Sequence, residues 1–232
     1  MRKLILILGF FSGILLLTDC SSDNEIDLSS VGYDYFPLEV GRYIDYQVEQ
    51  EIYTADGQVT MDSYQLRISV ADSFPNDAGS ITYILYRYSR SAENEDWTFQ
   101  STWSARREQI RGITVEGNVP FQTLSFPPRN GLRWDGNILN SSPPDTYTID
   151  SLGVQYEIEG FISGESLTVI QEDLLDFVIG EEDRRYEVYL KGVGLVEKGM
   201  RVLNLCTTGG CGSVPIESGT IYSQKAIGYG EM

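Results

Sequence analysis

The sequence contains no histidine, only three cysteines, and half as many basic as acidic residues. The missing histidine excludes every Ser-His-Asp or Cys-His catalytic arrangement, and it removes the commonest general base and the usual zinc ligand. Carboxylate pairs, lysine and tyrosine remain available for chemistry, so this absence favours a non-enzymatic protein but leaves the question open. The sequence nominates no catalytic residue, no metal ligand and no cofactor.

Positive charge is scarce: 17 Lys and Arg residues stand against 34 Asp and Glu residues, which gives a net charge of −17. A body this acidic repels nucleic-acid phosphate, so nucleic acid is excluded as a partner. Anionic lipid headgroups would repel it as well. Any contact with a membrane must therefore come from an anchor.

Only one long apolar run occurs, from Leu4 to Leu17, and it follows the basic pair Arg2 and Lys3. The run is shorter than the ~20 residues that span a bilayer comfortably, and its length is typical of a secretory signal. We therefore expect residues 1–19 to be a signal peptide that is removed on export.

The residues that follow, Leu17-Thr18-Asp19-Cys20, resemble a bacterial lipobox, in which leucine stands three places before the cysteine that receives the lipid. Asp19 departs from the small neutral residue that is usual there. The polar stretch 20–34 begins like the acidic tethers of Bacteroidota surface lipoproteins. The resemblance implies a lipidated Cys20 at the outer membrane or cell surface, held by acyl chains worth about 0.8 kcal/mol per buried CH₂.

Lipidation of Cys20 would leave Cys206 and Cys211 as a pair that brackets Thr-Thr-Gly-Gly. A disulfide between them suits an exported protein, and the very short loop that it closes limits its entropic contribution. Two free thiols are the alternative. A metal site is the third, and two thiols without histidine are poor zinc ligands.

Period-two alternation of apolar and polar residues dominates the chain after residue 34. It predicts an all-β fold, an antiparallel β-barrel or strongly curved sheet of about ten to twelve short strands. Residues 172–179 fit either a short helix or a bulged strand. We expect a single β-rich domain over residues 35–232, with a long irregular segment near 117–146 that is rich in Pro, Gly and Asn.

Two segments resemble a Bacteroidota family of cell-surface and outer-membrane lipoproteins. Phe36-Pro37-Leu38-Glu39-Val40-Gly41-Arg42-Tyr43 is similar to their N-terminal F-P-L-x-V-G-x-aromatic segment. Gly192-Val193-Gly194-Leu195-Val196 is similar to their C-terminal G-V-G-L-V hairpin. The resemblance implies a barrel-like β-domain anchored outside the cell, and it carries no catalytic residues.

Aromatic residues are concentrated on both parities of two adjacent predicted strands, 81–88 and 97–103. A core of two packed layers would explain them, and so would an aromatic wall for an apolar ligand or a sugar ring. Because side chains alternate along a strand, we expect Trp97, Phe99 and Trp103 to lie together on one face. The candidate wall consists of Tyr83, Tyr86, Tyr88, Trp97, Phe99 and Trp103.

Ser151 is a candidate modification site, because Asp150-Ser151-Leu152 is similar to the three-residue O-glycosylation pattern of Bacteroidota proteins. Acidic clusters at 93–96 and 181–183 lack the spaced ligands and turn glycine of a calcium loop, and we interpret them as solvated turns.

These features predict a membrane-anchored, exported lipoprotein that binds an apolar molecule, a glycan or a protein partner of the envelope without catalysis. A structural or assembly component of the outer envelope is the alternative hypothesis. A carboxylate-dependent hydrolase is a third, although sequence alone does not show the separation between carboxylates that such a reaction needs.

The anchor is tested by the substitution Cys20→Ala, which removes the sulfur atom expected to carry the lipid. We expect the protein to be released from membranes or to accumulate as the uncleaved precursor. Labelling by a fatty-acid analogue should disappear in the same variant. A wild-type chain that takes up no label would show that Asp19 defeats the lipobox and that the anchor hypothesis is wrong.

Overall fold

The alternating segments form twelve antiparallel strands and one turn of 3₁₀ helix. The computed structural model describes residues 31–77, 79–158, 162–207 and 216–232. The helix η1 spans Tyr33–Tyr35. The strands are β1 (Arg42–Tyr53), β2 (Val59–Pro75), β3 (Ile81–Arg90), β4 (Thr98–Arg107), β5 (Arg111–Glu116), β6 (Val119–Ser125), β7 (Arg133–Asp135), β8 (Thr146–Ile158), β9 (Ile162–Asp176), β10 (Glu181–Leu190), β11 (Gly194–Leu205) and β12 (Ile216–Glu231).

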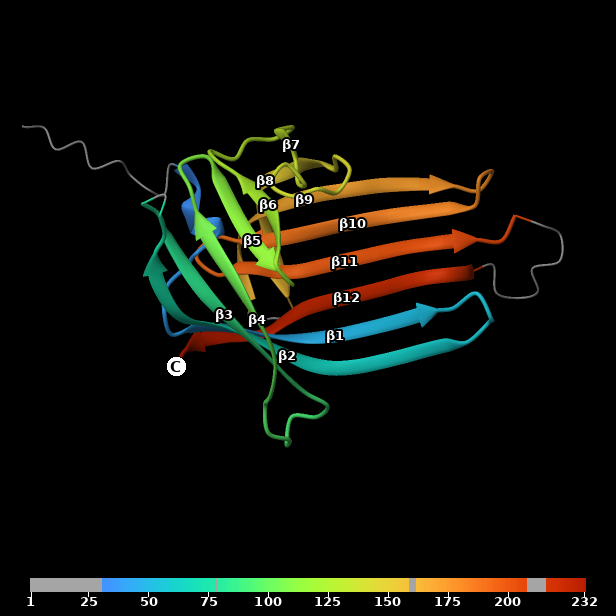
Figure 1. The fold of residues 1–232 in the computed structure, drawn as a ribbon, viewed down its shortest axis with the longest axis horizontal. Helices are drawn as coiled ribbons and strands as arrows, with labels where there is room; N and C mark the ends of the chain where they lie inside the picture. The colour runs from blue at the N-terminus through green and yellow to red at the C-terminus, as the bar shows by residue number, and fades with distance from the viewer. Residues whose placement is uncertain (1–30, 78, 159–161, 208–215) are drawn as a thin grey trace, which may run out of the picture.

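All twelve strands belong to one sheet, in the order β6-β5-β4-β3-β2-β1-β12-β11-β10-β9-β8-β7. Most neighbours in the sheet are neighbours in the chain, and β1 pairs with β12, which joins the first strand to the last. In Figure 1 the long strands β9–β12, β1 and β2 lie side by side, and β4–β6 cross in front of them. The predicted all-β fold is confirmed as a nearly closed antiparallel barrel.

Residues 172–179 belong to a strand and its turn rather than to a helix. β9 continues to Asp176, and the chain then turns into β10 at Gly180, whose φ of 74° places it in the left-handed region that favours glycine. Of the two alternatives for this segment, the strand is therefore the one that forms.

The two end strands of the sheet, β6 and β7, meet at a seam that has little backbone pairing. The backbone N–H of Gln122 donates to the carbonyl of Gly136 at 2.9 Å. The indole N–H of Trp134 donates to the carbonyl of Gln122 at 2.8 Å, and the amide of Asn140 donates to the carbonyl of Pro120 at 2.9 Å. Side chains therefore complete the closure that a strand ladder would otherwise provide.

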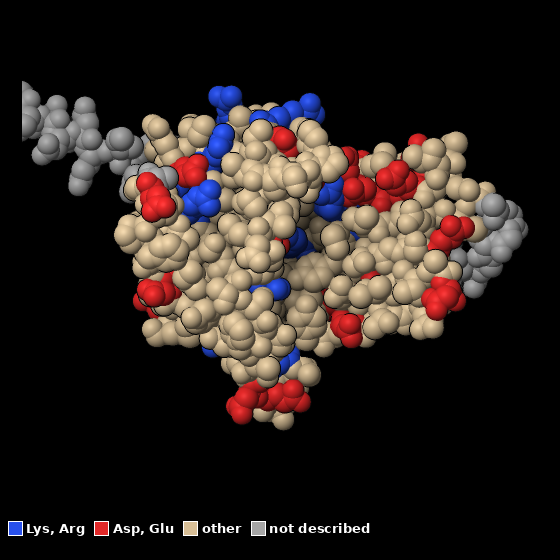
Figure 2. All heavy atoms as spheres, viewed as in Figure 1, with Lys and Arg blue, Asp and Glu red and all other residues tan. Residues whose placement is uncertain are grey.

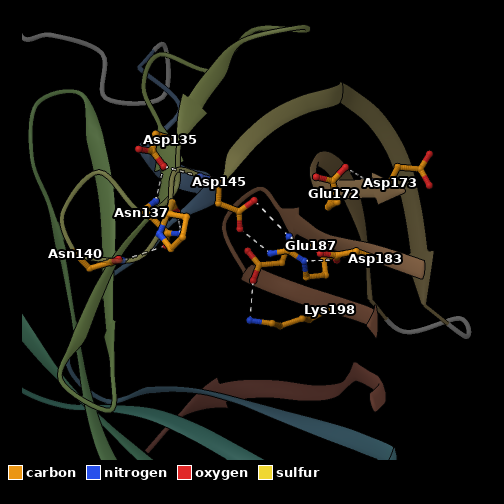
Figure 3. Close-up of polar contacts among 11 residues, drawn as sticks. Asp135, Asn137, Asn140, Asp145, Glu172, Asp173, Asp183, Glu187 and Lys198 are labelled. Carbon is orange, nitrogen blue, oxygen red and sulfur yellow. Dashed lines mark hydrogen bonds and ion pairs between the residues drawn. The ribbon is translucent and has the colours of Figure 1, made fainter. Parts of the chain in front are cut away.

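The segment 117–146, expected to be irregular, contains β6 and β7 together with a long loop. Pro120 fits in β6 because proline lacks a backbone donor and is tolerated on an edge strand. In the loop, one carboxylate oxygen of Asp135 accepts from the backbone N–H of Asn137 and of Asp145, both at 2.9 Å (Figure 3). The guanidinium of Arg185 on β10 binds Asp145 at 2.7 Å, so the loop is fastened to a strand two places away from β8 in the sheet.

Residues 31–41 form a plug that enters the barrel and contributes side chains to two of its hydrophobic core clusters. Tyr35 and Leu38 are each only 5% exposed, and they belong to two different core clusters. The Tyr35 cluster includes Leu124 of β6 and Ile149 of β8, so it packs together the two ends of the sheet. The last residues of the predicted tether 20–34 therefore belong to the folded domain, whereas residues 20–30 lie outside the described residues.

The predicted signal peptide, Cys20 and Cys211 also lie outside the described residues. Cys206 is disulfide-bonded, and its pairing with Cys211 stays a prediction. Across the described ranges, no helix is long and apolar enough to cross a membrane.

The seam is tested by Trp134→Phe, which keeps an aromatic ring against Tyr147 but removes the indole N–H that bonds to Gln122. We expect the free energy of unfolding, measured by urea denaturation, to fall by about 1–3 kcal/mol, because a buried carbonyl loses its partner. Trp97→Phe, a change of the same size on the outer face, is the control. Equal losses in the two variants would contradict a special role for the seam.

Candidate functional site

The inward-facing side chains leave a cavity of about 350 Å³ inside the barrel, at the lower end of the range for small-molecule sites. Strands from both halves of the sheet and the plug line it. Figure 2 shows the molecule hollowed near the middle of this face, where β4–β6 cross the long strands in Figure 1. The apolar part of the lining includes Phe36, Leu38, Ile68, Val70, Leu85 and Trp103.

One wall of the cavity is polar and charged. The ammonium of Lys198 on β11 lies 3.0 Å from a carboxylate oxygen of Glu187 on β10, and the two side chains face each other across neighbouring strands (Figure 3). The other oxygen of Glu187 accepts a hydrogen bond from the hydroxyl of Tyr189 at 2.6 Å. Glu187 is only 3% exposed, so an unpaired carboxylate there would be costly, and this bonding offsets that cost.

A second carboxylate, Glu116 at the end of β5, lines the same cavity. Burial raises the pKa of Glu116, and the opposing effects of Lys198 and Arg87 do not cancel this rise. Burial alone would lower the pKa of Lys198. The negative charges of Glu187 and Glu116 raise this pKa by more than burial lowers it, so Lys198 stays protonated. The polar wall thus holds the cation of Lys198 in an ion pair with Glu187, and the charge of Glu116 acts on the same cation.

Arg87 of β3 stands where the apolar and polar linings meet. Its guanidinium lies 4.0 Å from the centroid of the Trp103 ring, a cation–π contact. One terminal nitrogen reaches Ser101 at 3.5 Å, and among the described residues the buried Nε has no hydrogen-bond partner. A buried donor without a partner is unfavourable, and a bound acceptor would satisfy it.

The six aromatic residues of the predicted wall do not lie together. Leu85 pairs with Trp103 and Arg87 pairs with Ser101, but Tyr88 pairs with Phe99, so β4 carries one extra residue. This β-bulge reverses the alternation, as bulges do. Trp103 lines the cavity beside Leu85, whereas Phe99, beyond the bulge, faces the other side of the sheet. The expectation that Trp97, Phe99 and Trp103 share one face is therefore wrong.

Of the other five, Tyr83 packs against the core cluster of Leu38, and four lie away from the cavity. Tyr86, Tyr88 and Phe99 form a cluster of edge-to-face rings, in which Phe99 is 53% exposed. Trp97 stacks against the guanidinium groups of Arg67 and Arg90 at 4.7 Å and 4.4 Å. Only Trp103 of the six residues therefore lines the cavity. The candidate modification site Ser151 lies elsewhere: it is partly buried in β8 and pairs with Thr168 of β9.

Sequence reasoning missed Glu187, Lys198, Glu116 and Arg87. Alternation in β10 suggested that Val188 and Leu190 face the core and that Glu187 faces water. β10 is in fact buried on both faces, since every residue from Glu187 to Leu190 is less than 5% exposed. The uninterrupted apolar run Val188-Tyr189-Leu190 is the signal that could have indicated this.

Two solved structures resemble this chain. One is a provisionally assigned exported protein with a YmcC-like fold from Bacteroides fragilis, at 12% identity and a TM-score of 0.45. The other is a provisionally assigned lipoprotein from Parabacteroides distasonis, at 11% identity and a TM-score of 0.43. Each match covers 84% of this chain and 98% of the other. Likeness at this level assigns no function to this chain. No protein-family model and no curated protein matches it.

Within the ranges that the structure describes, no three or more Cys, Asp or Glu side chains are placed together so that they could hold a metal ion. The site is therefore defined by the cavity, with an apolar lining on one side and a charged, hydrogen-bonding wall on the other.

The charged wall is tested by Glu116→Gln. Because the pKa of Glu116 is raised in the folded state, that state binds the proton more tightly than the unfolded chain, and stability falls as pH rises through the folded pKa. We expect the substitution to increase the free energy of unfolding at pH 7 and to have little effect below pH 4, in urea denaturation over a pH series.

Glu93→Gln, in the exposed turn between β3 and β4, is the matched control and should leave the pH dependence unchanged. A Glu116→Gln variant that is less stable than the wild type at pH 7 would contradict the assignment of Glu116 as a destabilising buried carboxylate.

Proposed function

We propose that this protein is an exported lipoprotein, anchored through Cys20 in the outer membrane or at the cell surface, whose barrel binds a small amphiphilic molecule without catalysis. The observation that carries the proposal is the cavity, which is apolar on one side and polar on the other. An amphiphile has the same division, and the anchor would hold the protein where amphiphiles are concentrated.

The apolar part of the cavity suits a hydrocarbon chain. Leu38, Val70, Leu85 and Ala105 form one buried core cluster, and all four also contribute to the lining. Burying a methylene group against such a surface contributes about 0.8 kcal/mol, so a chain of moderate length supplies most of the affinity. The polar wall then orients the ligand, as a few polar groups do in most apolar pockets.

A carboxylate-dependent hydrolase is less well supported. Glycoside hydrolysis requires two carboxyl groups that both reach the substrate. Glu116 and Glu187 line one cavity, but both oxygens of Glu187 are engaged, by Lys198 and by Tyr189. This bonding suits a wall that positions Lys198 better than it suits a nucleophile or a base.

The proposal is tested by filling the cavity from two opposite walls, with Ala105→Trp on β4 and Met200→Trp on β11. The full chain in its membrane is exposed to a photoreactive octyl-chain alcohol, and the labelled peptides are mapped by mass spectrometry. In the wild type we expect saturable labelling of the peptides that contain β3 and β4. Both variants should lose at least about tenfold in apparent affinity, equivalent to ~1.4 kcal/mol.

Thr102→Trp adds the same ring to the exposed outer face of β4 and is the control, which should label as the wild type does. Melting curves of all variants separate blocked binding from unfolding. Labelling that persists in both filled variants, or that does not saturate in the wild type, would refute the proposed function.

A further inference from the structure

A second, polar hollow continues from the cavity along the inner face of β2, β3 and β4. This polar groove has a volume of about 430 Å³. Arg87 lines both the cavity and the groove, so the two hollows meet at this side chain. Tyr64 and Leu66 also line the groove, and its polar residues are Asp62, Ser63, Arg87, Ser89, Ser91 and Gln100.

Along β3, the inward-facing side chains change from apolar to polar in one direction. Leu85 lines the cavity, Arg87 lies at the junction, and Ser89 and Ser91 line the groove. Ser91 lies just past the end of β3. At a rise of about 3.3 Å per residue, the three positions within the strand, from Leu85 to Ser89, extend over ~13 Å. A ligand that follows this strand would thus meet apolar contacts first and hydroxyl groups last.

Of the two strands beside β3, only β4 changes from apolar to polar residues at the same level. Val70 and Trp103 are the partners of Leu85, and Ile68 and Ser101 are the partners of Arg87. On β2 the next inward-facing residue is again apolar, since Leu66 pairs with Ser89. The change from apolar to polar side chains therefore lies at one level on β3 and β4, and Tyr64 and Leu66 of β2 give the groove an apolar side.

The bulge in β4 supplies a key side chain of the groove. The extra residue, which reverses the alternation beyond Ser101, lets Gln100 face the groove, where its amide donates to the hydroxyl of Ser89 at 2.8 Å. The amide of Gln100 and the hydroxyls of Ser89 and Ser91 together offer both donors and acceptors, and hydroxyl groups of a ligand pair with either kind.

The charges of the groove favour a neutral ligand. Its lining contains one cation, Arg87, and one anion, Asp62. An anionic head would meet Asp62 and the net charge of −17 of the chain, and a cationic head would meet Arg87 at the junction. A neutral head that is rich in hydroxyl groups meets no such repulsion.

We propose that the polar groove is a head-group subsite for an uncharged, polyhydroxylated head, so that the ligand is a glycolipid or a related alkyl glycoside. This rests on the proposed binding of an amphiphile in the cavity. The hydrocarbon chain occupies the lining around Leu85 and Trp103, and the sugar hydroxyls bond to Gln100, to Ser89 and Ser91, and to the Nε donor of Arg87.

The test uses photoreactive octyl chains with four different heads: glucoside, hydroxyl, carboxylate and ammonium. The full chain in its membrane is labelled with each, and the half-saturating concentration is measured for the wild type and for the double variant Ser89→Ala/Gln100→Ala. Comparing the two proteins with the same probe cancels the partition of that probe into the bilayer. Thr102→Ala, which removes a hydroxyl from the outer face of the same strand, is the control.

We expect the double variant to raise the half-saturating concentration of the glucoside about tenfold, the effect of losing one or two hydrogen bonds, and to leave the hydroxyl probe unchanged. Unchanged binding of the hydroxyl probe also shows that the variant is folded. If the glucoside responds no more than the hydroxyl probe, the groove is not a head-group subsite, and cavity binding stands. A selective response of the carboxylate or the ammonium probe would overturn the neutral head. Failure of all four probes to saturate in the wild type would refute the cavity proposal and this inference together.

Discussion

The architecture depends on closing a sheet whose two end strands exchange little backbone hydrogen bonding. An open edge exposes unpaired N–H and C=O groups and invites pairing with other chains. Here the indole of Trp134 and the amide of Asn140 bond to backbone carbonyls of β6, and Leu124 packs with Ile149 across the same gap. Hydrophobic packing is non-directional, so it can join strands whose backbones do not pair in register. The cavity exists because this closure brings β4–β6 over β10 and β11.

The interior then contains charges that stability alone does not explain. Placing an ion in a protein interior costs several kcal/mol even after relaxation, and a well-packed apolar set is often as stable as a buried ion pair. The Lys198–Glu187 pair and the nearby Glu116 nevertheless line the cavity. Their hydrogen bonds, from Lys198 and Tyr189 to Glu187, fix the positions of the polar atoms before any ligand arrives. Such pre-organisation reduces the cost of ordering side chains on binding.

The β-bulge in β4 determines which side chains of this strand face the inside of the barrel and which face the outside. Without the bulge, strict alternation would place Phe99 on the same face as Trp103, and the hollow beside Arg87 would be aromatic. With it, Phe99 joins Tyr86 and Tyr88 outside, and Gln100 bonds to Ser89 inside. The polar character of the β4 side of the groove therefore depends on a single inserted residue.

The sequence by itself determined the strands and their antiparallel arrangement, because period-two alternation and glycine-containing turns are local signals. Ile44, Tyr46 and Val48 indicated β1 without any knowledge of its partners. The site was decided only by the tertiary structure. Whether Glu187 faces water or a cavity depends on β5 and β6 crossing over β10, and whether Phe99 joins Trp103 depends on a register shift against β3. Both are set by strand pairing between distant segments, which alternation within one strand does not encode.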